Sequence, residues 1–187
     1  SAGSTGPNWV RGAPEPTLIW MERGRAKAVI LQESVWREGG WSPKKAQVQL
    51  NKGFVNWADF PQAAVSLQGN SLYATLELLD HPNLSYGVRL NTESGNIAWL
   101  HQDMSGVEHG FPSLVAHPAE GWLAIWLDGR GGSGHGHGSE SERMSLMAAR
   151  VTATGEALGE IVIDARACSC CSTDLAFAED GAAWAVY

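Results

Sequence analysis

Short stretches of apolar or alternating apolar and polar residues dominate the chain, and Gly, Pro, Asn or Asp separates many of them. Such stretches are typical of β-strands joined by tight turns. They predict strands at 17–22, 28–31, 46–50, 63–67, 71–76, 113–116 and 122–127. Extended helical periodicity is missing, so the pattern predicts an all-β protein, with no helix longer than two turns in 63–79 or 114–127.

The strand pattern also repeats. A segment that starts at Asp59-Phe60-Pro61 resembles one that starts at Gly110-Phe111-Pro112, and Phe60 and Phe111 stand 51 residues apart. A weaker third copy covers 171–177 and 183–187. A repeat of about 50 residues that holds about four strands is typical of a β-propeller blade. We interpret the chain as one domain, 1–187, with blades near 7–50, 54–104 and 107–164 and a half blade at 168–187.

Three and a half blades do not make a complete propeller. Propellers close with about four to eight blades, and an open ring leaves a strand edge with unpaired backbone groups. We therefore expect the domain to be an incomplete piece of a longer protein, or to be completed by another chain.

Composition narrows the possible partners. The 187 residues are 44% hydrophobic, which supports one core rather than two domains. The formal net charge of -7 argues against a nucleic-acid partner, because phosphates repel an acidic surface. No apolar run approaches the roughly 20 residues that a membrane-spanning helix needs.

The three cysteines lie within four residues, as Cys168, Cys170 and Cys171. Their odd number prevents complete pairing in internal disulfides. Three interpretations stay open: a metal site, one local disulfide with a remaining thiol, and simple packing. Thiolates are soft ligands that favour copper(I) or zinc. An extended backbone directs Cys168 and Cys170 to one face, whereas Cys171 either needs a turn to join them or pairs with Cys168 in a disulfide across a short loop.

Strand alternation predicts which polar residues share one side of the blades. In a four-stranded antiparallel blade, the loop before the first strand and the loop between the second and third lie at the same end. The residues with ligand or acid–base side chains in these loops are Asn56, Asp59, His81, Glu108, His109, Asp128, His135, His137, Cys168, Cys170 and Cys171. We predict the three cysteines as metal ligands, with His109, His135 and His137 as supplementary ligands. The carboxylates Asp59, Glu108 and Asp128 are candidates for catalysis.

Each of these residues also has a simpler interpretation. The Gly-rich segment 128–139, which holds His135 and His137, can be a loop without fixed shape. Glu108 and His109 can form a structural hydrogen-bonding pair. Asp59 and Asp128 can cap turns or pair with Arg130 or Arg166. The tryptophans Trp57, Trp122 and Trp126 are expected in the core.

Several motifs resemble a group of exported bacterial proteins, the exo-α-sialidase-like or Asp-box (BNR-type) propellers. The similar stretches are Val55-Asn56-Trp57-Ala58-Asp59-Phe60-Pro61, Glu108-His109-Gly110-Phe111, Trp126-Leu127-Asp128-Gly129-Arg130 and Asp164-Ala165-Arg166-Ala167-Cys168-Ser169-Cys170-Cys171. The resemblance implies a sialidase-like propeller of four-stranded antiparallel blades, further strands beyond Tyr187, and a periplasmic or secreted location.

The same family gives a test of activity. Sialidases use an arginine triad, a tyrosine with a glutamate partner, and an acidic aspartate, and the motifs that carry the triad and the tyrosine are not recognisable here. The Asp box survives only as the altered segment 91–99. We therefore expect a non-sialidase binding protein for a small molecule, a glycan or a copper or zinc ion. A sialidase-type glycoside hydrolase acting on exposed glycans is the alternative, and whether the chain is an enzyme stays open.

Overall fold

The computed structural model describes residues 3–25, 28–131 and 144–187. These residues form strands almost throughout, and helical structure among them is limited to short 3-10 turns such as Gly129–Gly131. The predicted all-β class is confirmed, and so is the expectation that 63–79 and 114–127 hold no long helix. The strands predicted in the sequence analysis are all present.

The strands fall into four groups that follow chain order. The first group is β1 (Ser4–Arg11), β2 (Thr17–Arg23), β3 (Val29–Arg37) and β5 (Lys45–Leu50), with the short β4 (Gly40–Trp41). The second is β7 (Gln62–Val65), β8 (Ser71–Leu78), β9 (Tyr86–Thr92) and β10 (Ile97–Trp99), with the short β6 (Gly53–Phe54). The third is β11 (His109–Ala116), β12 (Trp122–Asp128), β13 (Met144–Val151) and β14 (Ala157–Ala167), and the last is β15 (Asp174–Phe177) with β16 (Ala183–Val186).

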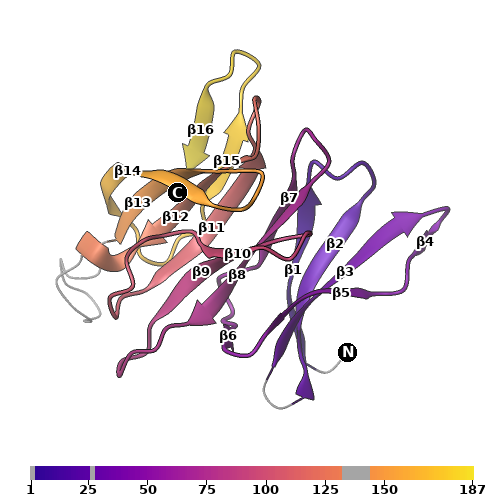
Figure 1. Ribbon diagram of the computed structural model, residues 1–187, viewed down its shortest axis with the longest axis horizontal. Helices are drawn as coiled ribbons and strands as arrows, with labels where there is room; N and C mark the ends of the chain where they lie inside the picture. The colour runs from indigo at the N-terminus through magenta and orange to yellow at the C-terminus, as the bar shows by residue number, and fades with distance from the viewer. Residues whose placement is uncertain (1–2, 26–27, 132–143) are drawn as a thin grey trace.

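Within each group, neighbouring strands pair antiparallel in chain order. The first two groups are joined into one ten-stranded sheet, because β1 and β7 pair in parallel through Val10 with Ala63 and Arg11 with Ala64. The sequence pattern did not predict this junction. No sheet formed by the described residues closes on itself. Figure 1 shows the groups side by side, from the indigo β1 to the yellow β15–β16 hairpin, with the first strands β1, β7, β11 and β15 toward the middle.

The core lies in three hydrophobic clusters, which pack successive groups of strands against one another. Trp122 and Trp126 of β12 are fully buried, as expected, and the indole Nε1 of Trp122 donates a 3.0 Å hydrogen bond to the carbonyl oxygen of Ala64 in β7. Trp57 differs from the expectation, since 89% of it is exposed. It stands in the loop before β7, where no neighbouring sheet covers it.

Candidate functional site

The three cysteines form one cluster directly after β14. The Sγ atoms of Cys168 and Cys171 are 2.7 Å apart, and those of Cys168 and Cys170 are 3.5 Å apart. All three Sγ atoms lie within 4.8 Å of one another, and all three residues are exposed thiols. The turn that the sequence required for Cys171 is therefore present, and the cluster can be reached from solvent.

A hydrogen bond between the thiols of Cys168 and Cys171 shifts their pKa values in opposite directions. The thiol of Cys171 donates to the sulfur of Cys168, and this hydrogen bond lowers the pKa of Cys168. The same bond is the main cause that raises the pKa of Cys171 to about 11. Metal ligation requires thiolates. Cys168 is therefore the sulfur most ready to bind an ion, and binding at Cys171 must displace its proton.

The sulfur spacing can be compared with known ligand geometry. Zn–S bonds of about 2.3 Å in a tetrahedral site place two thiolates about 3.8 Å apart. The Cys168–Cys170 separation of 3.5 Å is close to that value, whereas Cys171 would have to move outward from its 2.7 Å approach to Cys168. Among the described residues, the group that could hold a metal contains these three thiols and no imidazole or carboxylate.

The chain that leaves the cysteine cluster is anchored to β11. The Thr173 hydroxyl donates to the carbonyl oxygen of Phe111 at 2.7 Å and lies 3.0 Å from the Ser113 hydroxyl oxygen, while Ser113 donates to the carbonyl oxygen of Thr173 at 2.8 Å. Arg11 of β1 holds the next two residues: it forms an ion pair with Asp174 and donates to the carbonyl oxygen of Leu175. These bonds fix the position from which the three thiols project.

His109 lies in a separate buried cluster. It is fully buried at the start of β11, directly across from Asp128 in the β11–β12 register. Its Nδ1 is 3.0 Å from Asp128 Oδ2, and its ring stacks on that of His101 with centroids 3.8 Å apart. Nε2 of His109 faces Asp103 Oδ2 at 3.4 Å but makes no hydrogen bond with any described residue. The suggested Glu108–His109 pair is wrong, because the register places Asp128 opposite the imidazole.

His101 was not singled out by the sequence, yet it shapes this cluster. Its Nε2 accepts the backbone N–H of Val88, and its Nδ1 lies 2.7 Å from the carbonyl oxygen of Asp103. Burial, reinforced by neighbouring His109, lowers the pKa of His101 to about 4. A neutral ring therefore stacks on His109. His135 and His137, the other predicted supplementary ligands, lie outside the described residues.

Asp128 is fully buried and surrounded by donors. The indole Nε1 of Trp126 donates to it at 2.9 Å, and Arg130 donates through its backbone N–H and through guanidinium nitrogens at 2.8–2.9 Å. Burial alone would raise the pKa of Asp128, but the hydrogen bonds from His109 and Arg130 outweigh it and hold the pKa far below its usual range. Arg130 also bonds Glu160 of β14 at 2.7 Å. The predicted pairing of Asp128 with Arg130 is confirmed.

Asp59 is buried in a different place. Its backbone N–H and that of Ala58 donate to the Asn56 side chain, and its own Oδ2 accepts the backbone N–H of Phe111 at 2.6 Å. A Cβ at Gly110 would lie 2.5 Å from the same oxygen, so only glycine allows this approach. Burial raises the pKa of Asp59 to about 7, against the lowering effect of the Phe111 hydrogen bond. Neither arginine suggested by the sequence is its hydrogen-bond partner.

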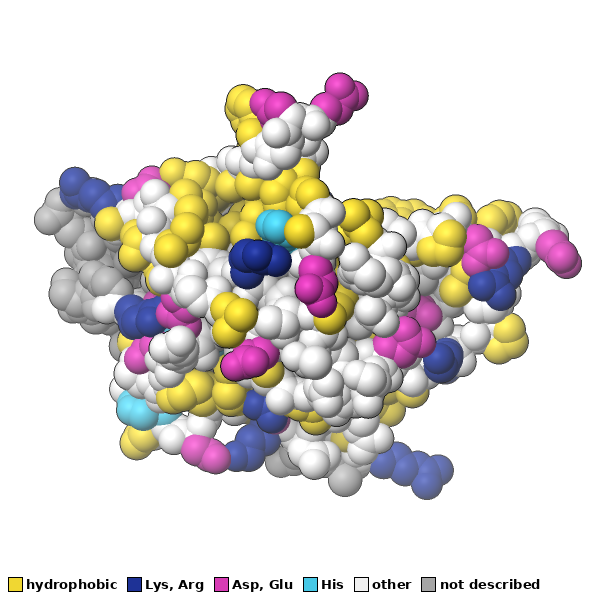
Figure 2. Space-filling view, turned by 45° about the horizontal axis from the view of Figure 1, so that its top comes forward, with side chains coloured by type: hydrophobic (Ala, Val, Ile, Leu, Met, Phe, Trp, Pro, Cys, Tyr) yellow, Lys and Arg dark blue, Asp and Glu magenta, His cyan; other side chains and the backbone are white. Residues whose placement is uncertain are grey.

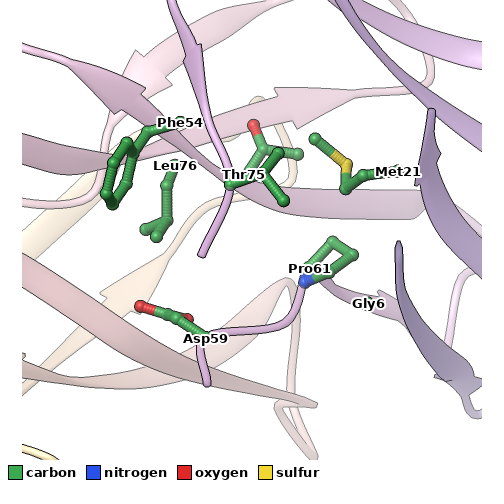
Figure 3. A pocket seen from close by; sticks show the side chains of 8 residues that line it. Gly6, Met21, Phe54, Asp59, Pro61, Thr75 and Leu76 are labelled. Atoms are coloured by element: carbon green, nitrogen blue, oxygen red, sulfur yellow. The ribbon is translucent and has the colours of Figure 1, made fainter. Parts of the chain in front are cut away.

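A small cavity adjoins Asp59. Figure 3 shows the carboxyl group beside it, with Phe54, Leu76 and Pro61 among the lining side chains. Its volume is about 10 Å³, which is room for about one water molecule. A sugar ring does not fit in this space.

Glu108, the third candidate carboxylate, faces Tyr86. The Tyr86 hydroxyl donates to Glu108 Oε2 at 3.4 Å. Burial, with the charges of Glu108 and Asp59, raises the pKa of Tyr86 above its usual range. The structure thus brings Asp59 and Glu108 to the same tyrosine and places Asp128 with His109 instead. Tyr86 belongs to no sequence motif. Only its position at the start of β9, directly after the loop between β8 and β9, could have pointed to it.

His81 lies beside Gly106 in the loop before β11.

No family model matches the chain, and no curated protein matches it. Within the described residues, no helix is long and apolar enough to cross a membrane.

On the face seen in Figure 2, Lys and Arg side chains are interspersed with Asp and Glu. Hydrophobic side chains gather around the base of the projecting β15–β16 hairpin, whose Trp184 and Val186 are 69% and 65% exposed.

Proposed function

We propose that this chain is part of an exported, sialidase-like β-propeller that binds a soft metal ion, copper(I) or zinc, through Cys168, Cys170 and Cys171. The observation that carries the proposal is the convergence of three solvent-accessible sulfurs within 4.8 Å. Packing alone does not account for it, because buried cysteines behave as small apolar residues, whereas these three are exposed. Soft thiolates select copper(I) and zinc over harder cations.

The propeller part of the proposal is supported by topology. Three groups of four antiparallel strands and one hairpin follow each other in chain order, and the first strand of the third group lies beside the first strands of the second and fourth. A radial arrangement of meandering sheets has this relationship between its innermost strands. Cys168 lies in the segment before β15, Asp59 in the loop before β7 and His109 at the start of β11. We propose that these three positions share one end of the blades.

We assign the three thiolates as the ligands of the ion and His109 a structural role. Its Nδ1 is engaged by Asp128, and it is not among the described residues grouped with the thiols. The ion would hold together the end of β14 and the start of β15, so its binding stabilises the folded state by mass action.

The competing proposal is a glycoside hydrolase of the sialidase type. The observation in its favour is that Tyr86, Glu108 and Asp59 lie together, with the pKa of Asp59 raised to about 7. The observation against it is burial, because Tyr86 and Asp59 are only 6% exposed and the adjoining cavity holds about one water molecule. We favour the metal-binding proposal, because its three thiols are exposed to solvent.

Elemental analysis of protein purified under reducing conditions without added metal tests the proposal directly. We expect about one copper or zinc ion per chain, and at least a tenfold loss of affinity in Cys168→Ser, measured by competition with a chromophoric chelator. Ser169→Ala is the matched control, since it alters the same loop and keeps all three thiols. Wild-type protein that binds neither ion, with its three thiols intact by titration, would refute the proposal.

A further inference from the structure

The approach of Cys171 to Cys168 is closer than metal ligation needs. Their sulfurs are 2.7 Å apart, which is between the disulfide bond length of about 2.05 Å and the spacing of about 3.8 Å for two thiolates on one zinc ion. Both side chains are exposed, so a dissolved reagent can reach either sulfur. In this contact the thiol of Cys171 is the donor and the sulfur of Cys168 is the acceptor.

We propose that Cys168 and Cys171 form a thiol–disulfide exchange site, which reacts with small-molecule disulfides and releases the bound ion when the pair closes. The inference rests on the proposed metal site for the release step alone. Closing the pair removes two of the three sulfur ligands, and Cys170 by itself cannot hold the ion at the same affinity.

The exchange balances in two steps. The Cys168 thiolate attacks one sulfur of the small disulfide, an S–S bond breaks, and one small thiolate leaves. Cys171 then loses its proton, and its thiolate attacks Cys168 Sγ in the mixed disulfide and expels the second small thiolate. Two protein thiols are oxidised to one disulfide, the reagent is reduced to two thiols, and the protons of the protein thiols end on the released thiolates.

Backbone geometry selects this pair over the other two. Cys170 and Cys171 are adjacent, so their Cα atoms stand about 3.8 Å apart across a trans peptide, which is less than the roughly 4.4 Å that a relaxed disulfide needs. Cys168 and Cys170 already lie 3.5 Å apart at their sulfurs, farther than Cys168 and Cys171. Cys168 and Cys171 are three residues apart across a turn, and their Sγ atoms are closer to each other than those of Cys168 and Cys170.

Oxidised glutathione on the metal-stripped protein tests the exchange. We expect the titratable thiols to fall from three to one, the mass to fall by two hydrogen atoms, and peptide mapping to find Cys168 joined to Cys171. Cys170→Ser should still form the bridge, whereas Cys168→Ser and Cys171→Ser should stop at mixed disulfides or unreacted thiols. A stable mixed disulfide in the wild-type protein, or a bridge that includes Cys170, would overturn the inference.

A second arm uses the zinc-loaded protein, because zinc has no redox chemistry of its own. We expect zinc, followed with a chromophoric chelator, to appear in step with bridge formation. If the stripped protein forms the bridge but the wild type binds no metal, the proposed function fails and the exchange site stands. If zinc binds and no bridge forms, the metal site stands and the exchange inference fails.

Discussion

Asp59 and Phe111 are joined by a 2.6 Å hydrogen bond from the Phe111 backbone N–H to the Asp59 carboxylate. Phe111 holds a left-handed backbone conformation, with φ of 50°, which is costly for a bulky side chain. Its carbonyl oxygen accepts the Thr173 hydroxyl at 2.7 Å. A line of hydrogen bonds therefore runs from the loop before β7, through the irregular start of strand β11, to the segment that follows the cysteine cluster.

Replacing Asp59 by Asn should change how stability depends on pH. Folded Asp59 keeps its proton up to about pH 7, whereas the unfolded chain loses it near pH 4. Between these values the folded state binds more protons, so the wild-type free energy of unfolding falls as pH rises, by at most about 1.4 kcal/mol per unit from this group. Asn has no such slope. Urea unfolding of both proteins between pH 4 and 8 measures the difference, and parallel curves would contradict the burial of an ionisable Asp59.

Thr173→Val should weaken metal binding without removing a thiol. Valine matches the shape of threonine but cannot donate to Phe111 or bond Ser113, so the segment after the thiols loses its anchor. We expect roughly a tenfold loss of zinc affinity, as for other residues that orient ligands. Thr152→Val is the matched control, because Thr152 caps the turn at the opposite end of β14. Equal affinities in the two variants would show that Thr173 does not position the site.

Asp128→Asn should destabilise the fold by about 3–5 kcal/mol, since it removes the charge that partners buried His109 and Arg130. Because its pKa is lowered in the folded state, Asp128 contributes stability above about pH 4, and that contribution is lost as pH falls below it. Urea unfolding at pH 7 measures the loss. Asp80→Asn is the control, because Asp80 pairs with Lys52 at an exposed position and should matter little.

The chain should not hydrolyse sialosides. Recognition of the sialic-acid carboxylate calls for a cationic clamp, and the space beside Asp59 is about 10 Å³. A fluorogenic sialoside should release its leaving group no faster than in buffer. Release that disappears in Asp59→Asn, while Asp80→Asn retains it, would instead favour the hydrolase proposal.

Sequence pattern alone predicted the strands and the segment that carries the thiols. Alternation in 46–50 and the apolar run 122–127 are local properties of the sequence, readable whatever the neighbouring strand is. The spacing of Cys168, Cys170 and Cys171 is equally local, so their convergence needed only one turn. The pairing of Asp128 with Arg130 was also predictable, since the two residues are two apart.

Tertiary structure decided which distant residues meet. The β1–β7 parallel pair, the Tyr86–Glu108 hydrogen bond and the Asp59–Phe111 bond each join segments far apart in the sequence, and alternation says nothing about which edge meets which. Two predictions were wrong because they depend on tertiary structure. His109 bonds Asp128 rather than Glu108, because the β11–β12 register sets His109 and Asp128 opposite each other. Trp57 is exposed rather than in the core, because no sheet covers its loop. Burial, and with it the raised pKa of Asp59, exists only once these sheets pack together.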